Sequence, residues 1–211
     1  MNFELADKLA DLLKENKLET AIETAESELR KIPNTEFHKV LDRDLLDLTK
    51  ELSEFLYAFY VSANEFYNKK KKGLFKRKAS SDDSKKLKSI YSEMNGFTIN
   101  YDLWFINLFA YNINNDLDDL DWLADYDYVF EYAMTIIGFE DLQDVFKNFM
   151  ESEEKTQNQK DAFDICELII VLRLQQLFKN AYEENSDRTD SWSQIPILVT
   201  AHDYEMIYKT R

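Results

Sequence analysis

The sequence predicts a mainly α-helical protein, a bundle of about six to seven helices in a single domain that spans residues 1–211. Glycine and proline are scarce, with three and two copies, and sheet-rich chains need both at their many turns. Apolar residues recur at helical spacing along most of the chain. With 45% hydrophobic residues, a chain of this length buries a large core without disulfides or a metal.

The segment 1–33 predicts a helical hairpin. Leucine recurs at helical spacing through residues 3–15, and leucine, alanine and isoleucine do so through residues 18–32. Asn16 and Lys17 separate the two stretches, and Pro33 ends the second.

Residues 36–68 predict one long helix. Its apolar stripe alternates spacings of four and three, as in Leu41, Leu45, Leu48 and Leu52. The stripe is wider than a coiled-coil seam, which favours a central bundle helix, with a dimerisation helix as the alternative.

The next stretch, residues 69–88, predicts a flexible basic loop. It holds ten basic and only two acidic residues. Three interpretations stay open, namely a solvated loop, a segment that contacts acidic membrane or nucleic acid, and one that folds back onto the protein's own acidic face.

An acidic and aromatic helical region is expected over residues 89–150. Residues 97–105 alternate apolar and polar side chains, which indicates a strand, but the pattern blurs afterwards, so residues 97–113 could be strand or helix. A helix is expected from about Asp118 to Ile137, with Gly138 at its end. An amphipathic helix should then run from Phe139 to Met150.

The last third of the chain predicts one deeply buried helix and a tail. A helix is expected over residues 161–184, and because it is apolar nearly all round from Ala162 to Leu174, it should be deeply buried. The tail, residues 185–211, contains the strand candidate Ile197 to Val199. Pairing of residues 97–105 with 196–208 would add a small two-stranded β element.

Signatures of catalysis and of metal or cofactor binding are sparse. The only histidines, His38 and His202, lack neighbours at ligand spacing. Three glycines cannot build a phosphate-binding loop. The single cysteine, Cys166, lies in an apolar run and is expected to be a buried, inert thiol. We therefore expect no enzyme activity, no metal and no cofactor.

Charge and hydropathy point to the cytoplasm. The net charge of −15 disfavours direct binding of nucleic acid and favours a basic partner. No signal peptide and no apolar run long enough to span a membrane is visible. The oligomeric state is left open.

The most informative feature is a stretch without cationic side chains. Residues 89–146 contain no Lys, Arg or His, but twelve acidic and fourteen aromatic residues. Either this is a solvated acidic face over an aromatic core, or its carboxylates await cations on a partner. In the second case the partner-binding residues are Asp116, Asp118, Asp119, Asp121, Trp122, Asp125, Tyr126, Asp127, Tyr128 and Glu131.

These observations favour a non-catalytic acidic binding protein. The leading hypothesis is a bacterial immunity or inhibitor-type protein that neutralises a basic toxin or effector, such as a nuclease, by occluding its active surface. A helical scaffold or adaptor that uses the N-terminal hairpin and the long helix is the first alternative. A carboxylate-based enzyme is the second, and it predicts a concave acid pair with a raised pKa.

Overall fold

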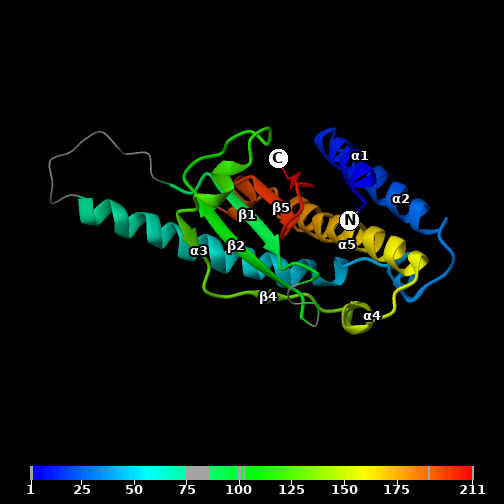
Figure 1. Ribbon diagram of the computed structural model, residues 1–211. Coiled ribbons are helices and arrows are strands. Elements are labelled where there is room, and N and C mark those ends of the chain that lie inside the picture. Colours follow the sequence, from blue (N-terminus) through cyan, green and yellow to red (C-terminus); the bar gives the residue numbers. More distant parts are fainter. Residues whose placement is uncertain (1, 75–85, 99–100, 102, 190, 211) are drawn as a thin grey trace.

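The computed structural model describes residues 2–74, 86–98, 101, 103–189 and 191–210. These residues form five α-helices and a six-stranded mixed sheet (Figure 1). The prediction of a six- to seven-helix bundle with at most two strands is therefore wrong. The helices are α1 (Phe3–Lys14), α2 (Leu18–Leu29), α3 (Thr49–Leu74), α4 (Glu140–Glu151) and α5 (Gln157–Glu184).

The sheet has the strand order β3-β2-β1-β5-β6, and β4 pairs with β2 on the same edge as β3. Only β1 and β5 are parallel, with Ile90 opposite Ile197. All other pairs are antiparallel. The strands are β1 (Ser89–Met94), β2 (Phe105–Tyr111), β3 (Tyr128–Val129), β4 (Met134–Thr135), β5 (Ile197–Ala201) and β6 (Tyr208–Lys209).

The expected pairing of residues 97–105 with 196–208 is wrong, although Ile197 to Val199 do form a strand, within β5. The described residues between Phe97 and Trp104 lie in the connection between β1 and β2, where Phe97 and Trp104 are buried. The partner of β5 is β1, which is buried on nearly all of its length. A strand covered on both faces shows no alternation, so the pattern could not reveal it.

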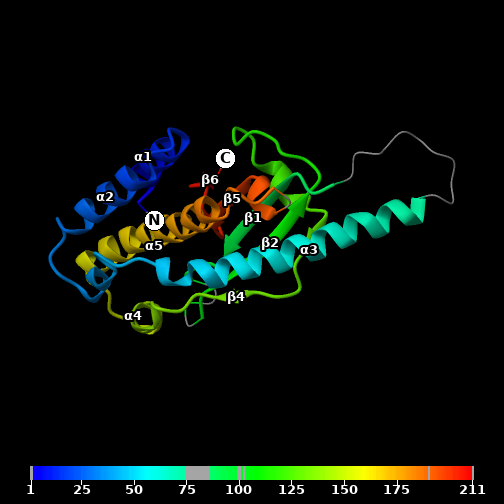
Figure 2. The ribbon, with the colours of Figure 1, turned by 180° about the vertical axis from the view of Figure 1, so that it is seen from behind.

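Helix α5 occupies the centre of the molecule, against one face of the sheet, with α2 and α3 packed beside it (Figures 1 and 2). The buried helix expected over residues 161–184 is confirmed. It begins four residues earlier, where the side chain of Thr156 accepts a hydrogen bond from the backbone N–H of Gln159 and forms a capping box. The N-terminal hairpin is also confirmed, as α1 and α2.

The single long helix expected over residues 36–68 is wrong in its first third. The chain instead forms two short 3-10 helices, η1 (Glu36–Val40) and η2 (Leu46–Leu48), before α3 begins at Thr49. Leu45 and Leu48 are buried all the same, so the apolar stripe reports burial rather than a continuous helix. Helix α3 runs to Leu74, so residues 69–74 are helical; residues 75–85 of the expected basic loop lie outside the described residues.

The helix expected from Asp118 to Ile137 is also absent. This segment contains the 3-10 helix η3 (Asp121–Ala124) and strands β3 and β4. Phe130 packs on Phe55 and Phe59 of α3, and the exposed Val129 precedes it. Gly138 has φ +94° and lies just before α4, the amphipathic helix that was expected from Phe139.

Candidate binding surface on the second face of the sheet

The two faces of the sheet are covered differently. One face packs against α3 and α5 and forms the main core, while a second, smaller apolar cluster lies on the opposite face. The loop of residues 112–127, named the acidic loop below, covers part of this second face (Figure 1). The fully or nearly buried members of the smaller cluster are Tyr91, Tyr111, Trp122, Leu198 and Ile207.

Trp122 anchors the acidic loop on the sheet. Its ring lies 5.1 Å from that of Tyr111 in an edge-to-face arrangement. Its indole Nε1–H donates a hydrogen bond to the carbonyl of Asp116 at 3.2 Å. The Tyr111 hydroxyl donates to the carbonyl of Leu123 at 2.7 Å. Trp122, which was expected to contact a partner, is therefore buried and holds the loop on the sheet.

Asp127 closes the other end of the loop. Its Oδ2 accepts a hydrogen bond from the Tyr67 hydroxyl of α3 at 3.1 Å and one from the Asn112 backbone N–H at 2.8 Å. Burial and the neighbouring Asp127 carboxylate raise the pKa of Tyr67. Tyr128, the next residue, is half-buried and packs on Phe66. These contacts fix the position of the loop relative to α3.

The seven other predicted partner residues are exposed. Six of them are carboxylates, and none of the six forms an ion pair with another described residue. The seventh residue, Tyr126, is 47% exposed and packs on Phe109. The seven are Asp116, Asp118, Asp119, Asp121, Asp125, Tyr126 and Glu131. Asp121 and Asp125 do not lie one turn apart on a helix, because the helix expected from Asp118 to Ile137 is absent and η3 is only four residues long.

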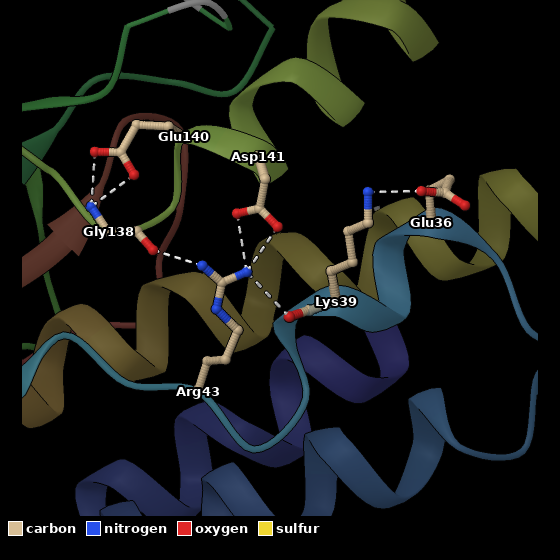
Figure 3. A network of polar contacts seen from close by, with 6 residues as sticks. All are labelled: Glu36, Lys39, Arg43, Gly138, Glu140 and Asp141. Carbon is tan, nitrogen blue, oxygen red and sulfur yellow. Dashed lines mark hydrogen bonds and ion pairs between the residues drawn. The ribbon is translucent and has the colours of Figure 1, made fainter.

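Near α4, in contrast to the acidic loop, Asp141 and Glu36 are paired with cationic side chains (Figure 3). The Asp141 side chain accepts two hydrogen bonds from Arg43, at 3.0 and 3.1 Å, and the same guanidinium donates to the carbonyl of Gly138. Arg43 also lies over the ring of Phe139. Lys39 pairs with Glu36 beside it. A surface depression is lined in part by this network, and there Glu36, Lys39 and Asp141 already have charged partners.

A single carboxyl group among the described residues has a clearly raised pKa. Burial raises the pKa of Glu167 on α5 to about 8, although a hydrogen bond from Tyr204 acts against the shift. Glu167 is almost fully buried and belongs to neither of the two depressions that the described surface shows. The nearby Asp164 carboxylate adds to the raised pKa of Glu167, and the concave acid pair of the enzyme alternative stays a prediction.

A polar cluster on the second face escaped the sequence analysis. The Glu93 carboxylate accepts a hydrogen bond from the Tyr91 hydroxyl at 2.9 Å and lies 3.0 Å from Nδ1 of His202. The parallel pairing of β1 with β5 brings these residues together from more than a hundred positions apart. Glu93 and His202 are so far apart along the chain that no local pattern pointed to the cluster. Among the described residues no group of three His, Cys, Asp or Glu side chains is placed to hold a metal ion.

Comparison with known protein families, curated proteins and solved structures finds no match to this chain. Within the part of the chain that the structure describes, no helix is both long enough and apolar enough to cross a membrane.

Proposed function

We propose that this protein is a non-catalytic binding protein whose acidic loop docks onto a basic surface of a protein partner. The observation that carries the proposal is the set of six exposed carboxylates on and beside the loop, none of which is paired with a described cation. Elsewhere the chain places Lys or Arg next to many of its acidic residues. A partner that supplies cations would relieve the repulsion within the loop.

The anchoring of the loop supports this proposal. Trp122 and Tyr111 hold one part of it, and Asp127 fixes its end to Tyr67. A loop held in place before binding loses less conformational entropy when a partner docks. Exposed Tyr126 adds the kind of rigid aromatic contact that often dominates binding free energy.

The partner class that fits best is a toxin or effector enzyme with a basic active surface, which makes the protein an immunity or inhibitor-type protein. Grooves that bind nucleic acid are lined with Lys and Arg because they neutralise phosphates. A nuclease groove would therefore meet the acidic loop with complementary charge. The mechanism would be steric occlusion of that groove, without any chemical step by this chain.

The test is affinity capture from the source organism with two charge-reversal variants. Asp118→Lys with Asp125→Lys changes the loop, and Asp7→Lys with Glu23→Lys changes two exposed carboxylates of α1 and α2 as the matched control. We expect wild type and control to retain one basic protein that high salt releases, and the loop variant to lose it.

The captured protein is then assayed for its own activity with and without this chain. Stoichiometric inhibition by wild type, and none by the loop variant, supports the inhibitor mechanism. Capture that is equal for all three proteins would overturn the loop as the binding surface and favour a scaffold that binds through its helices.

A further inference from the structure

The part of the second face that lies over β2 and β3 carries no layer of secondary structure in the described residues. Side chains of β2 alternate, so that Ile106 and Leu108 enter the main core while Phe105 and Phe109 point to the opposite face. Phe109 packs at the rim of the smaller cluster, between Tyr91 and Tyr126. Phe105 is half-buried and belongs to neither apolar cluster. Half-buried Asn107 lies between Phe105 and Phe109 on this face. Apart from it, the exposed strip of β2 here is apolar, and no described helix or strand covers it.

The edge of the sheet beside this area also has open backbone groups. Strands β3 and β4 both lie on the outer edge of β2 and pair with no other described strand. The Phe130 N–H donates to the Leu108 carbonyl, and Val129 lies opposite Phe109 in the same register. Consecutive residues of an antiparallel strand point their N–H and C=O groups to opposite sides. The groups of Val129 consequently point away from β2.

The same geometry holds at β4. The Ile136 N–H donates to the Trp104 carbonyl, and Thr135 lies opposite Phe105. The N–H and C=O groups of Thr135 therefore also point to the open side. Both Val129 and Thr135 are exposed. Two positions along one edge can thus exchange main-chain hydrogen bonds with a further strand.

The charge around this edge decides what kind of strand fits. Exposed Asp125 and Glu131 flank β3, and the Glu131 carboxylate lies close enough to raise the pKa of Tyr128, after burial as the main cause. Glu65 of α3, which also lies near Tyr128, is paired with Lys69 at 3.5 Å. No Lys, Arg or His occurs in residues 89–146. A second copy of this chain would bring carboxylates against carboxylates, whereas a basic segment would pair with them.

We propose that β3 and β4 accept an extended basic segment of the partner as an additional strand of the sheet. This inference rests on the proposed function and names the form of the partner's binding element. The segment alternates apolar and cationic residues. Its apolar side chains lie on the open face beside Val129 and Phe109, and its cationic side chains lie near Glu131.

The test uses the full chain and a capped nine-residue peptide of alternating lysine and valine as the probe. Val129→Lys places a charge on the edge, and Val61→Lys is the matched control because Val61, on α3, is 40% exposed against 41% for Val129. We expect Val129→Lys to weaken peptide binding at least tenfold and Val61→Lys to leave it within twofold of wild type. In wild type, the peptide should slow amide hydrogen exchange at Val129 and Thr135.

A second peptide separates strand pairing from simple charge attraction. It has the same sequence, but the backbone amides on the side that meets β3 are N-methylated. Strand addition predicts at least tenfold weaker binding for this peptide. Equal binding of both peptides, or equal binding by wild type and Val129→Lys, would overturn the proposal.

The captured partner distinguishes this inference from the proposed function. A partner that is lost with Asp118→Lys and Asp125→Lys but retained with Val129→Lys would overturn strand addition while the acidic loop stands. A partner that both variants lose, and that Val61→Lys retains, supports both proposals.

Discussion

The helical side of the molecule pairs many of its carboxylates with arginine or lysine, whereas the acidic loop on the opposite side of the sheet pairs none of its exposed ones with a described cation. Glu26 of α2 lies 2.6 Å from Arg173 of α5, and Asp141 of α4 lies 3.0 Å from Arg43. Among the described residues, Asp118 and the other exposed carboxylates of the loop have no such cationic partner. The ion pairs on the helical side join separate elements of the fold, whereas we propose that the loop carboxylates meet cations of a partner.

The contrast is sharpest at the Glu26–Arg173 ion pair, where we expect the largest effect on stability. Arg173→Met should lower the free energy of unfolding by about 3 kcal/mol. The substitution leaves the nearly buried Glu26 carboxylate with Arg30 as its remaining cationic partner among the described residues. Arg30 also contacts Glu26, but its side chain is 44% exposed. Arg30→Met should therefore cost less than about 1 kcal/mol. Urea unfolding measures both, and equal losses would contradict the account.

Glu167 represents a third case, a buried carboxyl group whose pKa is raised to about 8 by burial. The folded state holds its proton at pH values where the unfolded state, with a pKa near 4.5, has released it. The stabilising contribution is complete below pH 4.5 and is lost as pH rises toward 8. Between pH 5 and pH 7, wild type should lose about 2 kcal/mol more than Glu167→Gln. Chemical unfolding at several pH values checks this, and parallel curves would show that Glu167 ionises normally.

The network around Arg43 should have an intermediate effect. Arg43→Lys keeps the charge but cannot reach both Asp141 and the Gly138 carbonyl with the same planar group. We expect a loss of about 1–2 kcal/mol in the free energy of unfolding. Lys39→Met removes an exposed, solvent-screened ion pair with Glu36 and should leave the free energy of unfolding nearly unchanged. Similar losses for the two variants would mean that Arg43 has no special structural role.

The smallest effect on stability is expected in the acidic loop. Asp118→Lys with Asp125→Lys should leave the free energy of unfolding within about 0.5 kcal/mol of wild type, because no ion pair with a described residue is lost. Asp127→Ala should cost about 2 kcal/mol, because it removes the acceptor for Tyr67 and Asn112. Thermal unfolding distinguishes these outcomes. A large loss from the double reversal would place the loop carboxylates among the structural groups.

The sequence correctly predicted the helices and the strand whose apolar patterns are local. The helices α1, α2, α4 and α5 follow from apolar residues at helical spacing, and β5 follows from Ile197 to Val199. The sheet was missed because β1 is covered on both faces and its partners lie far away along the chain. Between Asp118 and Ile137 the aromatic residues could fit either a helix or a short strand. The alternation of Tyr128 with Phe130 around exposed Val129 was the signal for a strand.

The candidate site was predicted in part. The sequence identified the stretch without cations, and the structure places seven of its ten predicted residues on an exposed surface. It could not show that Trp122 and Asp127 hold the loop, because their partners Tyr111 and Tyr67 lie in other elements. It also could not show the open edge at Val129, since an edge exists only once the strands are ordered in a sheet.

The association rate with the captured partner tests most directly whether the exposed carboxylates of the acidic loop attract a basic partner. The rate constant for wild type should fall at least about tenfold between about 0.05 and 0.5 M NaCl, because salt screens the attraction. Asp118→Lys with Asp125→Lys should bind more slowly at low salt, and its rate should depend less on salt. The control, Asp7→Lys with Glu23→Lys, should show a salt dependence close to that of wild type. Equal rates and equal salt dependence for wild type and the loop variant would contradict the account.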